Sequence, residues 1–301
     1  MRVGERLAPD AAEELLFYQT LLGAAPTWPL SGDEKESVRT RVEDYMLKAV
    51  KEAKVNNSWT NHDPAYDEAI RTFVRKVFDA ETDDGFTEAM RALHKRCARA
   101  GRINSIATQL LKACAPGVPD VYQGTELFDL SLVDPDNRRP VDFARRKRLL
   151  EEIDARTDRL TLARELMQSP DDRLKLFVTA TALRTRRRLS PLFLEGAYVA
   201  LETVGQRGQH VCAFARVHQG AVAIAVAPRL VASLVGDRNA WSDTFVVLPD
   251  EVAEQVEARE AGLSDAFTGE VRRLARREGA YVLSTAEILR DFPLALLSMT
   301  A

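Results

Sequence analysis

The sequence predicts an α+β protein in which a mainly helical segment precedes a small antiparallel sheet domain. Two observations carry this prediction. Up to about residue 190, apolar residues recur at the spacing of amphipathic helices. From Ala197 onward they alternate or run continuously over strand lengths, with turn residues between the runs. We therefore expect two domains, residues 1–190 and residues 191–301, and we expect the strand-rich part from Ala197 to fold without the rest, because about 100 residues is a common domain size.

Composition and charge argue against several classes of partner. The 301 residues are 46% hydrophobic and 29% charged, as in an ordinary globular protein. A formal net charge of −3 gives no field that would attract nucleic acid or a membrane surface. No apolar leader follows Met1, and the three cysteines are widely spaced, which predicts reduced thiols in a cytoplasmic protein. Cys97 and Cys114 lie on apolar helical stripes and are expected to pack as small hydrophobic residues.

The first two helices begin at capping signals. Asp10 and Glu13 have the spacing of a capping box, and the apolar face that follows predicts a helix over residues 10–23. Ser31 and Glu34 repeat this spacing before the clearest amphipathic pattern in the sequence. We therefore expect both helices to begin with reciprocal side-chain caps.

Three more helical patterns follow before residue 115. Asp63 is expected to cap a helix that has Pro64 at its first position. Two further stripes cover residues 86–97 and 103–114, and Gly101 is expected to separate them. The sequence thus predicts five helices ahead of the first marked change of pattern.

The loop SWTNHDP, residues 58–64, contains two residues that could contact a ligand. An exposed Trp59 would be a platform for the face of a sugar ring, and a Trp59 held under the start of the next helix is the alternative. His62 is next to Asp63 and is interpreted as a loop or capping residue. The pattern alone leaves both interpretations of Trp59 open.

Two basic clusters, RRKR at 145–148 and RTRRR at 184–188, lie on predicted helices. Polyanion binding is one interpretation and a solvated helix face is the other. The negative net charge and the absence of interleaved aromatic residues favour a solvated face.

The stretch from Cys114 to Phe143 interrupts the helical pattern. Pro116 and Gly117 end a helix, residues 118–122 predict a short strand, and Gly124 allows a sharp turn after it. The polar loop that follows is rich in carboxylates and arginines. A helix, a short strand and a long polar loop are typical of a (β/α)8 barrel, whose strands carry active-site loops on their C-terminal ends.

Within this stretch, GVPDVYQGTE (117–126) resembles the last-strand motif of the α-amylase superfamily, glycoside hydrolase family 13, with its Gly-x-Pro-x-x-Tyr-x-Gly-x-Glu pattern. The continuation DLSLVDPDNRRPVDF (129–143) is similar to the malto-oligosyltrehalose synthase family within it. The Ser-Trp loop and the segments HVCAFAR, AVAPRL, WSDTFVVLP and DFPLALL extend the resemblance over nearly the whole chain. It implies a partial barrel that carries the last barrel strand, followed by a β-sandwich.

The resemblance implies an isomerase that works by intramolecular glucosyl transfer with retention. The reducing-end α-1,4 linkage of a maltooligosaccharide becomes an α,α-1,1 linkage, with no cofactor and no metal. Retaining chemistry needs two carboxyl groups about 5 Å apart, and the residues alone would suggest two of Glu126, Asp129, Asp134 and Asp136. The resemblance places the catalytic carboxylates on earlier barrel strands instead, so no catalytic residue is expected here.

The chain is therefore expected to be the C-terminal part of a longer enzyme and to be inactive by itself. The residues expected around the substrate pocket are Tyr122, Gln123, Glu126, Asp136, Asn137, Arg138, Arg139 and Trp59. In the loop, the acidic and basic residues could also simply tie the backbone down. The expected partners are a maltooligosaccharide and the N-terminal part of the barrel.

Two alternative functions remain open at this point. One is another enzyme of the amylase superfamily, a hydrolase or a branching enzyme, although DPDNRRPVDF argues against it. The other is a non-catalytic α-glucan-binding module on the sheet domain, where Trp241 is the clear aromatic candidate.

Overall fold

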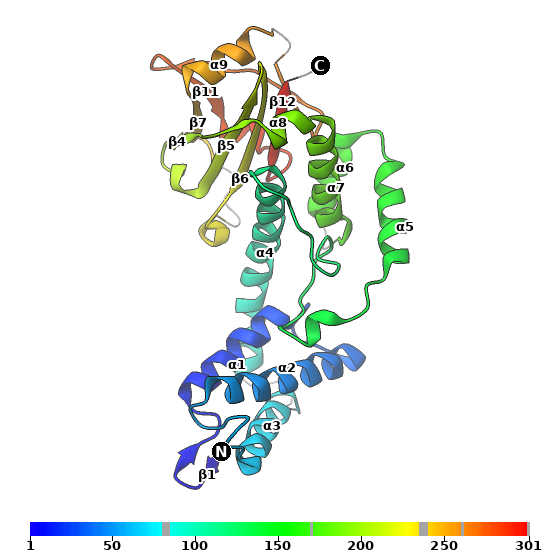
Figure 1. Cartoon of the computed structure of the whole chain (residues 1–301). Helices are drawn as coiled ribbons and strands as arrows, with labels where there is room; N and C mark the ends of the chain where they lie inside the picture. The colour runs from blue at the N-terminus through cyan, green and yellow to red at the C-terminus, as the bar shows by residue number, and fades with distance from the viewer. Residues whose placement is uncertain (80–84, 169–170, 235–239, 260–261, 300–301) are drawn as a thin grey trace. The chain divides into compact units, whose positions relative to one another are not determined.

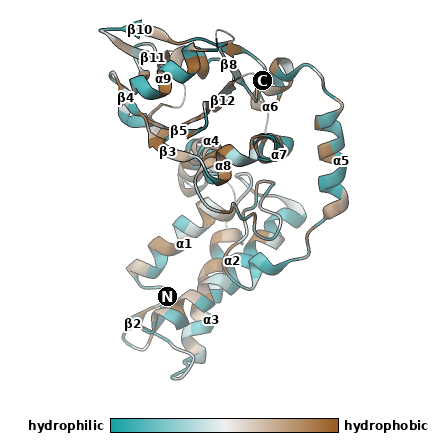
Figure 2. Ribbon diagram, turned by 45° about the horizontal axis from the view of Figure 1, so that its top comes forward, coloured by the Kyte–Doolittle hydropathy of each residue, from teal (hydrophilic) through white to brown (hydrophobic). Residues whose placement is uncertain are grey.

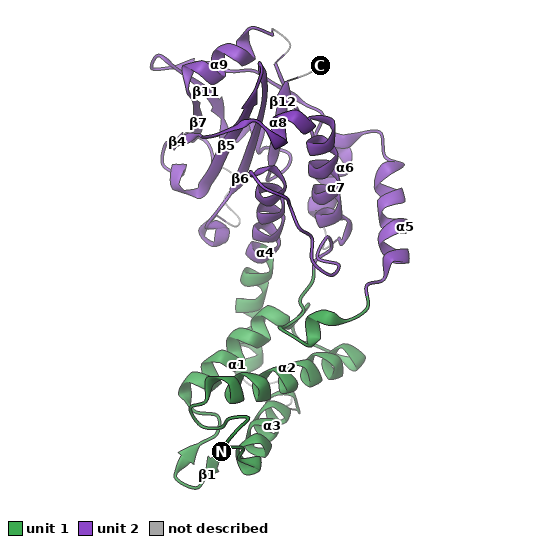
Figure 3. Cartoon of the chain, in the orientation of Figure 1, with its two compact units in different colours: residues 1–99, 129–140 green, residues 100–128, 141–301 purple. Residues whose placement is uncertain are grey.

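The computed structural model describes residues 1–79, 85–168, 171–234, 240–259 and 262–299. Their contacts divide the chain into two compact units, which Figure 3 draws in different colours. Unit 1 comprises residues 1–99 and 129–140, and unit 2 comprises residues 100–128 and 141–301. The domain boundary predicted near residue 190 marks the change from helices to strands and not a division by contacts. It therefore stays a prediction.

Unit 1 is mainly helical. Its elements are β1 (Arg2–Val3), β2 (Arg6–Leu7), α1 (Ala11–Ala24), α2 (Gly32–Ala53), α3 (Pro64–Asp79), the first part of α4 (Gly85–Cys114) and the 3-10 helix η1 (Asp136–Arg138). Buried side chains of α1, α2 and α3, among them Phe17, Met46 and Ile70, form one apolar core. The predicted helical stripes therefore face one another, as burial of apolar surface requires.

Two of the predicted caps are formed. Asp10 Oδ1 accepts hydrogen bonds from the backbone N–H groups of Ala12 and Glu13, both at 2.9 Å, and Glu13 Oε2 accepts one from Asp10 N at 3.0 Å. Asp63 Oδ1 accepts from Ala65 N at 3.0 Å and from Tyr66 N at 3.2 Å. These bonds pair amide groups that the first turn of a helix leaves without partners.

Two predictions about helix boundaries were wrong. Ser31 precedes α2 but makes no side-chain capping bond, and Glu34 accepts a hydrogen bond from Thr27 Oγ1 at 3.0 Å instead. Helix α4 runs without interruption through Gly101. A glycine costs a helix about 1 kcal/mol relative to alanine, whereas fully burying one side chain such as Ile106 contributes about 1.5–3 kcal/mol.

Unit 2 begins with helices, which agrees with the helical pattern predicted up to about residue 190. They are the last part of α4, α5 (Phe143–Asp154), α6 (Arg159–Gln168), α7 (Arg173–Arg188) and α8 (Ser190–Leu194). In Figure 2, hydrophilic residues colour much of α5, and the structure buries only Ile153 of that helix. By contrast, α7 is buried along most of its length, so it is the central helix of this unit.

Two antiparallel sheets complete unit 2. The six-stranded sheet has the order β3 (Ala197–Ala200), β5 (Val211–His218), β6 (Ala221–Pro228), β12 (Ala295–Met299), β8 (Leu263–Asp265), β9 (Val271–Arg272). The four-stranded sheet has the order β10 (Ala275–Arg277), β11 (Ala280–Ser284), β7 (Phe245–Leu248), β4 (Glu202–Val204). Every strand pair is antiparallel, which confirms the antiparallel sheets predicted after Ala197. Helices α9 (Asp250–Glu257) and α10 (Thr285–Ile288) connect strands.

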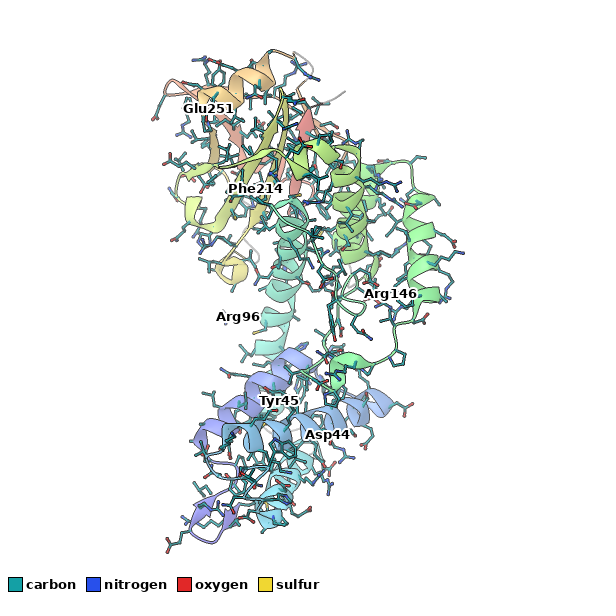
Figure 4. All side chains as sticks on the ribbon, viewed as in Figure 1. Asp44, Tyr45, Arg96, Arg146, Phe214 and Glu251 are labelled. Carbon is teal, nitrogen blue, oxygen red and sulfur yellow. The ribbon has the colours of Figure 1, made fainter. Side chains whose placement is uncertain are left out.

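Both faces of the six-stranded sheet are buried. Along β5, Ala213 and Ala215 belong to the core shared with the four-stranded sheet, whereas Phe214 belongs to the core formed with α4, α7 and α8. Figure 1 shows the end of α4 and α7 beside β6 and β12, and Figure 4 labels Phe214. Because successive strand residues point to opposite faces, this double burial explains why β5 and β6 are apolar at nearly every position.

The predicted strand at Val118–Tyr122 is not formed. Among the described residues no strand lies between β2 and β3, and residues 118–122 are a loop that leads into a turn. A barrel strand is held by hydrogen bonds to strands on both sides, and this segment has no strand to pair with. Its Val118 side chain is 92% exposed. That the segment belongs to a (β/α)8 barrel therefore stays a prediction.

Candidate functional site

The turn after residue 121 is the first part of the candidate site and lies in unit 2. Thr125 N donates to Tyr122 O at 2.9 Å, and Leu127 N donates to Gly124 O at 3.3 Å. Gly124 has a φ of +89°, and a Cβ added there would lie 2.5 Å from Arg146 Nη2. The left-handed backbone conformation favours glycine here, and an added Cβ would displace the Arg146 guanidinium.

Arg146 holds this turn together. Its guanidinium forms an ion pair with Glu126 and donates to Gly124 O at 2.7 Å and to Asp142 O at 3.1 Å. The side chains of Arg146 and Glu126 are 18% and 19% exposed, so the pair is largely removed from solvent. Arg146, labelled in Figure 4, was assigned from the sequence to a solvated helix face. It lies 20 residues after Glu126, and no spacing rule connects positions so far apart.

Tyr122 and Gln123 lie beside this fixed carboxylate. Tyr122 is 51% exposed, and Gln123 adopts a left-handed backbone conformation with φ of 40°. A non-glycine residue in that region is uncommon, because its Cβ crowds the backbone. Residues 122–126 therefore present an exposed phenol and a preoriented carboxylate on one constrained turn.

The segment before the turn is anchored through backbone carbonyls. Lys112 Nζ donates to Asp120 O, and Arg186 donates to the carbonyls of Ala113, Ala115 and Gly117. Arg186 thereby satisfies carbonyl groups that the end of α4 leaves without helical partners. The RTRRR cluster thus includes an arginine with an anchoring role, which neither polyanion binding nor a solvated helix face predicted.

The acidic and basic part of the loop, residues 129–140, lies in unit 1. Asp136 accepts two hydrogen bonds from Arg41 Nε, at 3.1 and 3.0 Å, and one from Leu132 N at 2.7 Å. Burial raises the pKa of Asp136, but the bonds from Arg41 and Leu132 outweigh burial, so its pKa lies below the ordinary value. An ionised carboxylate with these partners is an acceptor and cannot act as a proton donor near neutral pH.

The neighbours of Asp136 have different settings. Arg139 donates to Ser131 Oγ at 2.8 Å, and Arg138 forms an ion pair with Asp134 in which both side chains are well exposed. The Oδ1 atom of Asn137 is buried and accepts no hydrogen bond within the described residues. Asp136 and Arg139 thus anchor the loop, and contact of the cluster with sugar hydroxyl groups stays a prediction.

Trp59 lies elsewhere in unit 1, on a loop that Asn57 organises. Asn57 Oδ1 accepts from Ser58 N at 2.9 Å and from Asp63 N at 2.8 Å, while its Nδ2 donates to Asp67 Oδ1 at 2.8 Å. Trp59 itself is 60% exposed, so it is not packed under the start of the next helix, and its role as a sugar platform stays a prediction.

One edge of the Trp59 environment is charged. The Lys51 ammonium lies 4.8 Å from the centroid of the Trp59 ring and 2.7 Å from Asp67, which also pairs with His62 at 2.7 Å. Burial raises the pKa of Asp67, but the bonds from Lys51 and His62 lower it by more than burial raises it. The pKa of Asp67 therefore lies below its ordinary value. His62 is thus hydrogen-bonded to Asp67 within the loop, which agrees with its interpretation as a loop residue.

The structure divides the predicted site residues between the two units. Tyr122, Gln123 and Glu126 belong to unit 2, whereas Trp59 and residues 136–139 belong to unit 1. Within each unit the residues are held by arginine or asparagine side chains that the sequence analysis did not select, namely Arg146, Arg41 and Asn57.

Other sequence predictions have mixed outcomes. Cys114 is buried, and burial raises its pKa to about 12, whereas Cys97 is exposed and does not pack as predicted.

The described residues contain no group of His, Cys, Asp and Glu side chains that could hold a metal ion. No helix in the described ranges is long and apolar enough to cross a membrane. Trp241 packs against the core between the sheets, which weakens it as a sugar platform.

Comparison with known proteins identifies relatives over most of the chain, although no family model matches it. A protein of Mycobacterium tuberculosis (strain CDC 1551 / Oshkosh), named "Putative maltooligosyl trehalose synthase", is 35% identical over 243 residues, which are 81% of this chain and 28% of the relative. The protein of the same name from strain H37Rv gives the same values.

Solved structures give the same result. The maltooligosyltrehalose synthase of Arthrobacter ramosus is similar with a TM-score of 0.74 and 34% identity, over 99% of this chain and 34% of that one. A second maltooligosyl trehalose synthase structure has a TM-score of 0.64 and 26% identity, over 95% of this chain and 33% of that one. The chain thus spans about a third of the length of its relatives. It belongs to the maltooligosyl trehalose synthase family.

Proposed function

We propose that this chain is the C-terminal part of a maltooligosyl trehalose synthase. The observation that carries the proposal is the 35% identity over 81% of the chain to a relative of that name. The complete enzyme would convert the reducing-end α-1,4 linkage of a maltooligosaccharide into an α,α-1,1 linkage by intramolecular transglucosylation with retention. This is an isomerisation, and it needs neither a metal nor an organic cofactor.

The part of the reaction assigned to this chain is substrate binding. A retaining enzyme needs a nucleophile and an acid about 5 Å apart. Glu126 is paired with Arg146 and Asp136 with Arg41, and the lowered pKa of Asp136 makes it a poor acid. Carboxylates fixed in this way are suited to accept hydrogen bonds from sugar hydroxyl groups. The catalytic carboxylates would then lie in the barrel, outside this chain.

Each proposed contact residue supplies a different kind of interaction. Tyr122 would pack against a sugar ring while Gln123 and Glu126 bond its hydroxyl groups. In unit 1, Asp136, Asn137, Arg138 and Arg139 would supply charged and amide groups. Trp59 would offer its exposed face to a further glucosyl unit. Holding glucose in place while excluding water is what separates glucosyl transfer from hydrolysis.

The proposed macromolecular partner is the remaining part of the barrel. Val118, in the loop before the turn, is 92% exposed, and Phe143, at the start of α5, is 72% exposed. Exposed apolar side chains of this size favour a covering surface. The last barrel strand, which the isolated segment does not form, would be completed by pairing with that partner.

A chimera tests the proposed function. In the Arthrobacter ramosus relative, the third that matches this chain is exchanged for residues 1–301, and the product is incubated with maltopentaose. We expect loss of reducing ends without net hydrolysis, as with the intact relative. A chimera that unfolds cooperatively but leaves the reducing ends unchanged would contradict the proposal.

A further inference from the structure

The outer face of the four-stranded sheet has an unusual composition. In β7, Val246 and Leu248 face the core between the sheets, so Phe245 and Val247 face outward. The paired strands add Val204 and Val282 to the same outer face. Solvent-facing strand positions in an antiparallel sandwich are ordinarily polar. An apolar outer face is therefore a surface that a ligand or another chain would cover.

This face is hollowed into a pocket. A cavity of about 440 Å³ is lined by Glu202, Val204, Gly205, Asp243, Phe245, Val247, Arg277, Glu278, Ala280 and Val282. Its apolar floor includes Val282, which is only 4% exposed. Two of the lining residues lie close together, because Gly205 has a φ of +99° and a Cβ there would lie 2.0 Å from Asp243 O. Ligand pockets in proteins usually measure about 300–1,000 Å³, with apolar walls and few polar groups.

The polar groups at the rim restrict the chemistry of the occupant. Glu202, Asp243 and Glu278 contribute three carboxylates, against one guanidinium from Arg277. This balance repels anions such as phosphate. The Arg277 guanidinium lies 4.3 Å from the centroid of the Phe245 ring and provides N–H donors at the side of the pocket. A neutral ligand with apolar ring faces and many hydroxyl groups matches an apolar floor with acceptors and donors at the rim.

We propose that this pocket is a second α-glucan site, separate from Trp59 and from residues 122–139. The choice of an α-1,4-glucan among neutral sugars rests on the proposed function. The pyranose faces pack on Phe245 and the valines, and the hydroxyl groups donate to Glu202 and Asp243. Such a site retains a long substrate near the enzyme through multivalency while its reducing end reacts elsewhere.

The test is a titration of the whole chain, labelled on its valine methyl groups and tryptophan indole nitrogens, with maltoheptaose. We expect saturable shifts of the Val204, Val247 and Val282 signals, with no shift of Val246 on the opposite face of the same strand. Ala280→Phe fills the cavity and is expected to weaken binding at this site at least tenfold. Glu251→Gln removes an exposed carboxylate of α9 that does not line the cavity, and it should leave the affinity unchanged (Figure 4).

Several outcomes would overturn the second site. The first is that maltoheptaose still shifts the Val204, Val247 and Val282 signals in Ala280→Phe, while an unchanged Val246 signal shows that the variant is folded. Equal shifts with cellohexaose would exclude a preference for α-glucan. Response of the Trp59 indole signal alone would contradict the second site and leave the proposed function standing. Concentration-dependent shifts without sugar would mean that a second copy of the chain covers the face.

Discussion

Among single residues, the arginines of the candidate site differ in what surrounds them. Arg41 and Asp136 are 16% and 14% exposed, whereas Arg138 and Asp134 are 69% and 47% exposed. Exposed ion pairs contribute at most about 1 kcal/mol to stability, because solvent screens them. Arg41 is thus a structural residue of the loop, whereas the exposed pair of Arg138 and Asp134 contributes little to stability.

We therefore predict that Arg138→Ala lowers turnover in the active chimera more than it lowers stability. The melting temperature should change by no more than about 2–4 °C, which corresponds to roughly 1 kcal/mol in a protein of this size. Arg41→Ala is the matched control and should reduce melting temperature and turnover together. Equal losses of stability and turnover in Arg138→Ala would assign it to loop anchoring.

Asp265 gives a prediction about pH. Its carboxylate is buried and accepts bonds from Phe267 N at 3.1 Å and Thr268 Oγ1 at 2.9 Å, and burial raises its pKa from 3.8 to about 6. The raised pKa means that the fold favours the protonated form. Its contribution to stability is complete below about pH 4 and is lost as the pH rises through about 6.

Asp265→Asn should therefore be more stable than the natural chain at pH 7 and should lose this advantage near pH 4. The shift of about two pKa units corresponds to on the order of 3 kcal/mol, less whatever the amide loses in its bond to Thr268. Urea unfolding of both proteins from pH 4 to pH 8 measures the difference. A difference independent of pH would show that Asp265 is already paired in its charged form.

Among the elements, the starts of α2 and α3 offer a matched comparison. Asp63 caps α3 through two backbone amides and pairs with Arg6, whereas Ser31 makes no side-chain bond at the start of α2. We predict that Asp63→Ala costs about 0.5–2 kcal/mol. Ser31→Ala should change the free energy of unfolding by no more than about 0.5 kcal/mol. Denaturant unfolding of the two variants gives both values.

The six-stranded sheet argues against independent folding of residues 197–301. Phe177 of α7 lies against Phe267 and Phe292 of the strand-rich part, at ring distances of 5.9 and 5.8 Å. Without α7 and α8, one apolar face of the sheet would be exposed. A fragment of residues 171–301 should then unfold more cooperatively than a fragment of residues 197–301. Calorimetry of both fragments measures the cooperativity of unfolding. A sharp transition of the 197–301 fragment would support the prediction that these residues fold without the rest.

For the whole molecule, we predict that the chain alone converts no maltooligosaccharide. Glu126, Asp134 and Asp136 are paired with arginines, and misplacement of reacting groups by about 1 Å costs on the order of a hundredfold in rate. The assay is incubation with maltopentaose and measurement of reducing ends. A steady loss of reducing ends that Glu126→Gln abolishes would show that the chain is an enzyme by itself and that Glu126 is catalytic.

Local signals in the sequence determined most of the elements. Helix stripes, the caps at Asp10 and Asp63, the turn at Gly124 and the strands after Ala197 all depend on residues within a few positions of one another. Periodicity therefore predicts them without knowledge of the fold. The motif at 117–126 and its continuation at 129–143 likewise identified the family, because both are contiguous patterns.

Only the tertiary structure decided which groups meet across long sequence distances. Arg41 is 95 residues from Asp136, and Arg146 is 20 residues from Glu126. The sequence presented Arg146 as part of a basic helix face, since charge alone does not specify a partner. The absent strand at Val118–Tyr122 has the same cause, because a strand exists only where neighbouring strands accept its hydrogen bonds. Pairing and burial are properties of the assembled fold, and a local pattern does not contain them.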